Sequence, residues 1–522
     1  MDFTLLSNYI LPRLDLVELF NLNQFMDFSL LYSNNLKMFL PEIFLATSIL
    51  LLTLHASFIA TSRFLGYPLI SKSFNKLCVL ALVLTFLLAS NNTIVFMITY
   101  QNTFIFDWLT LNVKQIILLS SIFCLLISEL TIARQQINNF EYFVLILCAI
   151  LGLMFLVSSY DMISLYLSIE LQSLCLYVLS ASKKDSSFST EAGLKYFILG
   201  SFSSALLLFG ISLLYGCTGT TNFDNFYLMF SEMENTDLIL ESLIVKALFC
   251  IAAAFFFKIA AAPFHMWSPD VYEGSPTSST IFFAVIPKIV LFGIFLRIFQ
   301  TIFSGFEDVF LFPLIFFSIS SVIVGSFIAL KQKKLKRLLA YSSINHVGYL
   351  LLAFSANSLE GTQALFFYLI VYMVTSLCIW SILLSLNTSV NEQRSKTLVD
   401  LASVSISNPI LGFTAMLALF SLAGVPPLAG FFAKMEIFIS ALSASLIWAS
   451  LVAILLSVIS SYYYIRLIKT IYFETKQEFC FVLPLTRSCS LVMGVMVFLL
   501  IYLFLNPSLL LLVTQKMSLC LF

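Results

Sequence analysis

The sequence predicts an all-α polytopic membrane protein, and its composition, its long apolar runs and its few charges all favour that class. Hydrophobic residues make up 60% of the chain and charged residues 10%, and the mean hydropathy is +1.01. A soluble domain would be about one quarter charged, so the composition excludes a soluble enzyme. The net charge is zero, which gives no electrostatic basis for binding nucleic acid.

Apolar runs long enough to cross a bilayer follow one another along the chain. A membrane-spanning helix needs about 20 such residues. Residues 1–36 are more polar and precede the first run, so we expect a segment at the membrane interface there. The runs predict about fourteen spans, near residues 38–60, 77–98, 112–132, 140–158, 160–181, 190–216, 238–267, 278–302, 310–330, 336–356, 361–387, 408–440, 445–470 and 488–513.

The charges of the loops predict the orientation. Basic residues concentrate in loops after odd-numbered spans, whereas acidic residues dominate the loops after even-numbered spans. The positive-inside rule places the basic loops on the cytoplasmic or matrix side and both termini on the outer side. The loop 268–277, with Asp270 and Glu273, is an acidic exception on the inner side. It follows an interrupted span, and one interpretation is that it dips toward the membrane.

Helix breakers interrupt two spans. The seventh span breaks at Ala262-Pro263, and the twelfth breaks within residues 423–430, which hold two prolines and two glycines. Backbone groups freed at membrane depth are tolerated only against protein or a water-filled cavity. Because the breaks lie five spans apart, we predict two inverted five-helix repeats with discontinuous helices 7 and 12, a pattern typical of transporters. The predicted interfacial segment, three-helix segment, first repeat, second repeat and last helix are 1–36, 37–132, 140–302, 310–470 and 488–513.

Charged side chains within the spans are the candidates for proton transfer. Each costs about 2.5–3.5 kcal/mol at mid-span, so such residues usually have a function. Burial lowers the pKa of a lysine and a nearby carboxylate raises it, so a buried lysine beside a glutamate can bind and release a proton near neutral pH. The candidates are Glu170, Lys195, Lys258, Lys288 and Lys434.

For Lys195 and for two histidine candidates, a structural role is an alternative to proton transfer. Lys195 lies within two turns of the start of its span, where a lysine side chain can instead extend to the membrane surface. His265 and His346 can be hydrogen-bonded core residues, the usual role of a single buried histidine. However, His265 follows the first break and His346 lies in the polar run Ser-Ser-Ile-Asn-His, so both are also candidates for a proton relay.

Motifs for cofactors are lacking from the sequence. It has no dinucleotide fingerprint after a strand, no phosphate-binding loop and no paired-histidine haem pattern. The ten cysteines are scattered without a CxxC pair, which favours small buried side chains over metal ligation. We therefore expect no cofactor-binding residues and no metal site in this chain.

Five stretches between about residues 160 and 440 resemble one known family. They are KIAAAPFHMWSPDVYEGSPT, SIELQSLCLYVL, EAGLKYFILGS, KRLLAYSSINHVGYLL and SLAGVPPLAGFFAKM. On these motifs the chain resembles the NADH dehydrogenase subunit 2 family, the N-type antiporter-like subunits of respiratory complex I. The resemblance implies the same fourteen-span bundle, with proton translocation driven by redox chemistry in partner subunits.

The resemblance also implies partners, location and roles. NADH, FMN, iron–sulfur clusters and ubiquinone would be bound by partner subunits, and this chain would contact neighbouring antiporter-like subunits and lipids. The length and the many phenylalanines suggest a non-animal mitochondrial inner membrane, with a bacterial plasma membrane as the alternative. By motif match, the fifth-span glutamate and the sixth-, seventh-, eighth- and twelfth-span lysines of the family are Glu170, Lys195, Lys258, Lys288 and Lys434.

Two other functions remain open from the sequence. The first is a subunit of a cation/proton antiporter that is not linked to NADH oxidation. The second is a structural subunit that joins its neighbours and no longer pumps protons. Residence in an assembly with flavin and iron–sulfur clusters would exclude the first, and proton pumping that depends on Lys258 would exclude the second.

Overall fold

The computed structural model describes residues 27–59, 71–92, 96–134, 139–231, 238–385, 397–402, 404–474 and 487–521. Residues 1–26 of the predicted interfacial segment therefore lie outside the described residues. Residues 27–36 of that segment belong to helix α1, which spans Asp27–Ile59. No proline or glycine separates them from the first predicted span, so the helix begins earlier than predicted.

Helices form nearly all the regular structure in the described residues. A two-stranded antiparallel hairpin, with Ile98 opposite Ile105, precedes the third helix. The elements of the N-terminal segment are α1, α2 Ser71–Ser90, β1 Met97–Thr99, β2 Phe104–Phe106 and α3 Trp108–Arg134. Those that follow are α4 Phe140–Ser158, α5 Met162–Ser180, α6 Ser187–Thr218, α7 Phe223–Ser231, α8 Leu238–Ile259, α9 Trp267–Gly274 and α10 Thr277–Leu296.

The second half of the chain repeats this helical character. A π-helical turn, η4 Arg297–Ile302, and a 3₁₀ turn, η5 Ser304–Phe306, lead into it. Its elements are α11 Glu307–Lys331, α12 Leu335–Ser355, α13 Leu359–Ser385, η6 Leu398–Leu401, α14 Val404–Ser407, α15 Pro409–Ala423, α16 Ala429–Ser443, α17 Ile447–Tyr472, α18 Arg487–Leu505 and α19 Ser508–Leu519.

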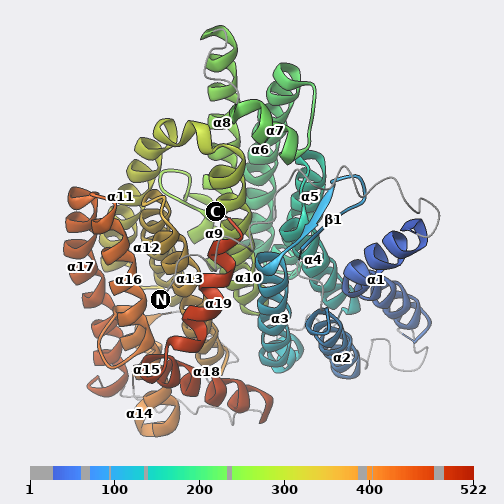
Figure 1. Ribbon diagram of the computed structural model, residues 1–522. Coiled ribbons are helices and arrows are strands. Elements are labelled where there is room, and N and C mark those ends of the chain that lie inside the picture. The colour runs from blue at the N-terminus through green and yellow to red at the C-terminus, as the bar shows by residue number, and fades with distance from the viewer. Residues whose placement is uncertain are drawn as a thin grey trace.

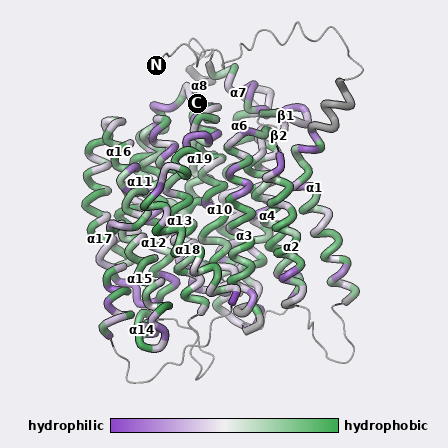
Figure 2. The backbone as a smooth tube through the Cα atoms, turned by 60° about the horizontal axis from the view of Figure 1, so that its bottom comes forward, coloured by the Kyte–Doolittle hydropathy of each residue, from purple (hydrophilic) through white to green (hydrophobic). Residues whose placement is uncertain are grey.

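Thirteen helices in the described part of the chain are long and apolar enough to cross a membrane. The predicted twelfth span, 408–440, forms the two shorter helices α15 and α16 instead of one long helix. The all-α polytopic class is confirmed. Figure 2 shows hydrophobic residues along most of the bundle, with α7, the hairpin and the C-terminal end gathered at one end.

Both predicted breaks have a local cause. Helix α8 ends at Ile259, and the next residue, Ala260, has a positive φ of 64°. Helix α15 ends at Ala423, and its C-cap residue Gly424 has a φ of +83°, the left-handed conformation that glycine adopts most easily. The predicted last span, 488–513, also differs, because Pro507 separates α18 from α19 and a proline cannot continue the hydrogen bonding of a helix.

The two halves pack in the same pattern. In the first half the order is α4, α5, α6, the broken pair α8/α9 and α10, and in the second it is α11, α12, α13, the broken pair α15/α16 and α17. In each half, the first helix packs on the second, the second on the third, and the third on both parts of the broken helix. The fifth helix packs on the first, on the second and on the first part of the broken helix. This correspondence supports the predicted repeats, whose limits remain a prediction.

The centre of the bundle is where the two halves meet. Helix α10 of the first half packs against α13 of the second, and Figure 1 shows both in the middle of the molecule. Helices α10 and α12 are buried along a complete 18-residue stretch. Polar side chains on these helices are therefore shielded from lipid, which is the condition for a buried functional site.

Candidate functional site

Lys258 lies in the last turn of α8, directly before the first break. Its Nζ donates a hydrogen bond of 3.5 Å to the Tyr177 hydroxyl and lies 5.9 Å from the centre of the tyrosine ring. The C-terminus of a helix carries a partial negative charge that favours a cation. The break therefore creates a place for a charged lysine inside the bundle.

Glu170 on α5 is the carboxylate among the candidate residues. The Ser173 hydroxyl donates to Oε2 of Glu170 at 3.4 Å, whereas Oε1 is buried without a hydrogen-bond partner. The ion pairs found among the described residues do not join Glu170 to Lys258. The carboxylate thus keeps an oxygen free to accept a proton or a new hydrogen bond.

A small cavity connects Lys258 to Lys288. Its volume is about 30 Å³, which is room for about two water molecules. Side chains of Gln172, Ser173 and Tyr272 give it polar groups with which water can form hydrogen bonds. The two lysines are therefore close enough to be linked through water rather than by direct contact.

Lys288, which follows Pro287 within α10, reaches the second half of the chain. Its buried Nζ donates a 3.4 Å hydrogen bond to the Tyr372 hydroxyl on α13. The ring of Tyr372 lies 5.1 Å, centre to centre, from the ring of His346 on α12. Tyr372 thus contacts a candidate from each half of the molecule.

His346 is held on both sides by tyrosine hydroxyls. Its Nδ1 lies 2.6 Å from the hydroxyl of Tyr368 on α13, and its Nε2 lies 3.0 Å from that of Tyr464 on α17. The side chain is only 3% exposed. Since both ring nitrogens have a partner that can donate or accept, the ring can pass a proton from one nitrogen side to the other.

Lys434 ends the series at the second break. Its Nζ donates to the carbonyl oxygens of Leu422 and Ala423, at 3.0 and 2.8 Å, which are freed at the C-terminus of α15. A cavity of about 10 Å³ is lined by both Lys434 and His346 and has room for about one water molecule. Lys434 therefore lies beside the carbonyl end of a helix, but it belongs to the helix after its break, whereas Lys258 belongs to the helix before its break.

Five of the seven predicted site residues form one line through the bundle, called the buried line below, in which Lys288, His346 and Lys434 are buried and Glu170 and Lys258 are half-buried. It runs from α5 and α8 through the central helices α10 and α12 to α16. Hydrogen bonds, a ring contact and two small cavities connect its members, and Glu170 joins the line through Ser173, which lines the first cavity. They are Glu170, Lys258, Lys288, His346 and Lys434.

The other two candidates lie apart from this line. The side chain of Lys195 is 44% exposed and forms ion pairs with Glu191 at 2.8 Å and Asp270 at 3.2 Å. His265 is buried in the break beside the ring of Tyr341, and its Nδ1 has no hydrogen-bond partner. Neither side chain is among those that line the two cavities.

Sequence reasoning missed the tyrosines of the line. Tyr177, Tyr368, Tyr372 and Tyr464 all lie in spans, but they are four of 21 tyrosines in a chain that is 15% aromatic. A tyrosine in an apolar run is ordinarily a packing residue, so its identity carries no signal of a proton path. Only the distance from the tyrosine hydroxyl to a lysine or histidine side chain in the folded chain indicates such a path.

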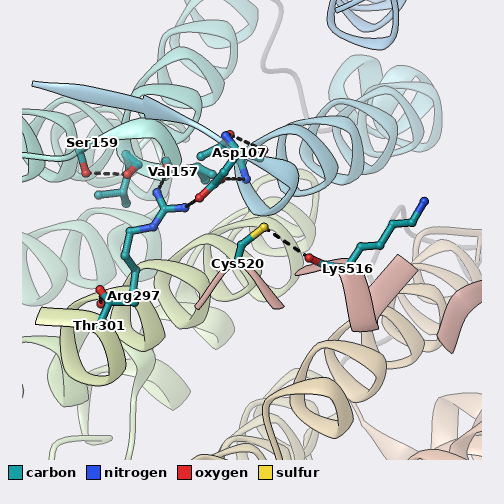
Figure 3. A network of polar contacts seen from close by, with 9 residues as sticks. Asp107, Val157, Ser159, Arg297, Thr301, Lys516 and Cys520 are labelled. Atoms are coloured by element: carbon teal, nitrogen blue, oxygen red, sulfur yellow. Dashed lines mark hydrogen bonds and ion pairs between the residues drawn. The ribbon is translucent and has the colours of Figure 1, made fainter. Parts of the chain in front are cut away.

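Two buried ion pairs were also missed. Glu42 on α1 pairs with Lys114 on α3, and both side chains are at most 2% exposed. Arg297 pairs with Asp107 at 2.5 Å and also donates to the carbonyl oxygen of Val157 at 3.1 Å (Figure 3). Glu42, Lys114 and Arg297 lie inside predicted spans, so their charges could have indicated buried ion pairs. Both pairs lie outside the buried line. They join α1, α3, α4 and the end of α10.

Comparison with known proteins identifies the family. A family model described as NADH:quinone oxidoreductase/Mrp antiporter, TM, matches residues 159–460, more than half of the 522-residue chain. The chain belongs to this family. The match includes the whole buried line and both breaks.

Individual relatives within the NADH:quinone oxidoreductase/Mrp antiporter family match almost the whole chain. The chain is 42% identical to NADH-ubiquinone oxidoreductase chain 2 of Marchantia polymorpha, covering 92% of this chain and 98% of the relative. It is 40% identical to the protein of that name from Arabidopsis thaliana, with coverages of 92% and 96%. It is also 41% identical to NADH-quinone oxidoreductase subunit N of Pelagibacter ubique, with coverages of 85% and 91%. The predicted resemblance is confirmed.

Solved structures support the fold. A chain of respiratory complex I from Thermus thermophilus superposes with a TM-score of 0.74 at 28% identity, covering 90% of this chain and 98% of that chain. A chain of the Mrp complex from Dietzia sp. DQ12-45-1b gives a TM-score of 0.78 at 18% identity, with coverages of 93% and 97%. The second likeness shows the fold alone.

Proposed function

We propose that this chain is the antiporter-like membrane subunit of an NADH:quinone oxidoreductase, complex I, and that it translocates protons across the membrane. The names of its relatives support the assembly, and the chain covers nearly all of their length. The buried line from Glu170 to Lys434 carries the proposal for proton transfer. Within the interior of the described bundle, it joins titratable side chains of both halves.

Protons enter from the inner side near Lys258 and Lys288. Glu170 changes how strongly Lys258 holds its proton, since a carboxylate nearby stabilises the charged lysine. From Lys288 the proton passes to the Tyr372 hydroxyl, and then through water in the second cavity, which Tyr372, His346 and Lys434 all line, to His346 and Lys434. The last step releases it toward the outer side.

The energy for this transfer comes from partner subunits. Moving one charge against the membrane potential costs about 2.3 kcal/mol per 100 mV. In our proposal NADH, FMN, iron–sulfur clusters and ubiquinone are bound by the partners, and this chain has no redox centre. The scattered cysteines without a CxxC pair support that division. The membrane is the mitochondrial inner membrane or a bacterial plasma membrane.

Native gel electrophoresis tests the assembly. Membranes are solubilised mildly, and the gel is probed for this chain and stained for NADH oxidation. We expect the chain to co-migrate with a large band that oxidises NADH. Migration in a smaller band without NADH oxidation would contradict the proposal and favour a cation/proton antiporter.

The substitution Tyr372→Phe tests the connection between the halves. It removes the hydroxyl that Lys288 donates to and leaves the packing of the ring unchanged. The proposed path then lacks a hydroxyl to pass the proton on from Lys288, so we expect proton translocation to slow about tenfold or more, which corresponds to a barrier higher by about 1.4 kcal/mol or more. The measurement is NADH-driven acidification by the reconstituted assembly.

The matched control is Tyr462→Phe, at a tyrosine of α17 that is 62% exposed. It should translocate protons like the wild type. Equal rates for both variants and the wild type would show that protons do not pass Tyr372.

A further inference from the structure

Helix α9 is a short helix with two different faces. Trp267 and Tyr272 line the cavity that holds Lys258 and Lys288. Both side chains form hydrogen bonds to the helices around the cavity. Trp267 Nε1 donates to the carbonyl oxygen of Phe257 at 2.9 Å. The Tyr272 hydroxyl donates to the carbonyl oxygen of Phe283 at 3.5 Å. The opposite face of α9 carries Asp270 and Glu273, the acidic residues on the inner side of the membrane, where the other loops are basic.

Those acidic residues are the centre of an ion-pair network. Asp270 accepts from Lys195 of α6 at 3.2 Å and lies 3.4 Å from the Arg337 guanidinium of α12. Glu273 lies 3.5 Å from the same guanidinium and also pairs with Lys334. Arg337 thus holds two carboxylates that are one helical turn apart on α9.

The network connects the two halves of the molecule. Helices α6 and α9 belong to the first half, whereas Lys334 and Arg337 begin α12, which carries His346 in the second half. Close to it, Lys336 Nζ donates to the carbonyl oxygen of Ser275 just after α9, at 2.8 Å. Helix α9 is therefore fixed from both halves on its outer face and forms the cavity wall with its inner face.

We propose that Lys195, Asp270, Glu273 and Arg337 are positioning residues that hold α9 against the Lys258–Lys288 cavity and limit the entry of water from the inner side. The proposal deepens the proposed function and rests on it, because water in this cavity matters only if Lys258 carries protons. It also gives Lys195 a role outside the buried line. The side chains are partly exposed, with 44% for Lys195, 37% for Asp270, 23% for Glu273 and 36% for Arg337. Salt therefore screens these pairs, and the position of α9 depends on ionic strength.

Hydrogen–deuterium exchange in the intact solubilised assembly tests the proposal. The readout is the exchange rate of backbone amides in residues 267–275. In the double variant Asp270→Asn/Glu273→Gln, which keeps the shape of both side chains, we expect exchange about three- to tenfold faster than in the wild type. The matched control, Glu191→Gln, removes a carboxylate that pairs with Lys195 within α6 but does not touch α9, and it should exchange like the wild type.

A salt series keeps the test informative if the double variant does not assemble. Raising the salt concentration should speed α9 exchange in the wild type by a similar factor. Equal α9 exchange in all proteins and at all salt concentrations would overturn the proposal. This readout does not require proton transport, so it separates failure of the network from failure of the proposed function.

The second measurement is the number of protons translocated per NADH oxidised. We expect the ratio to fall in the double variant and to stay at the wild-type value in Glu191→Gln. Faster α9 exchange with an unchanged ratio would overturn the role of the four residues in proton entry.

Discussion

Replacement of Lys258 by methionine is expected to abolish proton translocation by this chain while the chain still inserts and assembles. The methionine keeps most of the volume of the side chain but cannot carry a proton. Because a lysine costs about 2.5–3.5 kcal/mol at mid-span, its removal lowers the cost of insertion. Loss of function would therefore not arise from a misfolded bundle. The measurement is proton translocation per NADH oxidised by the reconstituted assembly, together with its band on a native gel.

The matched control is Lys246→Met on the same helix. Lys246 is exposed, three turns before Lys258, and it is outside the buried line. We expect this variant to pump like the wild type. If Lys258→Met pumps as well as Lys246→Met, the line does not carry protons and the chain is a structural subunit.

The largest effect on stability is expected at the buried pair of Asp107 and Arg297. Their side chains are 6% and 3% exposed, respectively. The variant Asp107→Asn leaves the guanidinium without a charged partner, and breaking a buried pair from one side costs about 3–5 kcal/mol. Asparagine still caps α3, where Oδ1 of Asp107 accepts from the Thr110 amide at 2.8 Å. The measured loss therefore reports the ion pair rather than the cap.

The measurement is the thermal unfolding midpoint of the solubilised protein. The control Asp308→Asn changes an exposed aspartate near the start of α11 and should have little effect. The double variant Asp107→Leu/Arg297→Leu should lose less stability than expected from the two single changes, since no unpaired charge remains buried. A midpoint for Asp107→Asn equal to that of Asp308→Asn would contradict the assignment.

Some elements of the site were predictable because the membrane restricts what a sequence can contain. A charge at Lys258 or Lys434, and prolines at 263, 426 and 427, stand out against apolar surroundings, and each is costly unless the fold accommodates it. The two breaks and the helices that carry them follow from that contrast. The exact ends of the helices could not be predicted from this contrast, because they depend on local caps and on neighbouring elements. Helix α1 and the last predicted span are examples.

The roles of Lys195 and Lys288 illustrate the limit. Both are lysines in predicted spans and both match family motifs, although Lys195 lies near the start of its span and could also extend to the membrane surface. In the folded chain Lys288 donates to Tyr372 in the core, while Lys195 pairs with Asp270 at a partly exposed site. The difference lies in which helices surround each residue, and those helices are far away in the sequence.

The sequence by itself determined the membrane class, the helical spans, the two breaks, the charged candidates and the family. These properties depend on local composition and on short motifs, which apolar surroundings make conspicuous. Only the tertiary structure decided that Tyr372 connects Lys288 to His346, that two small cavities complete the line, and that α9 is held by charges from both halves. Such relations join residues far apart in the sequence, as Lys288 and Tyr372 are at 84 positions, and they exist only once the helices have packed.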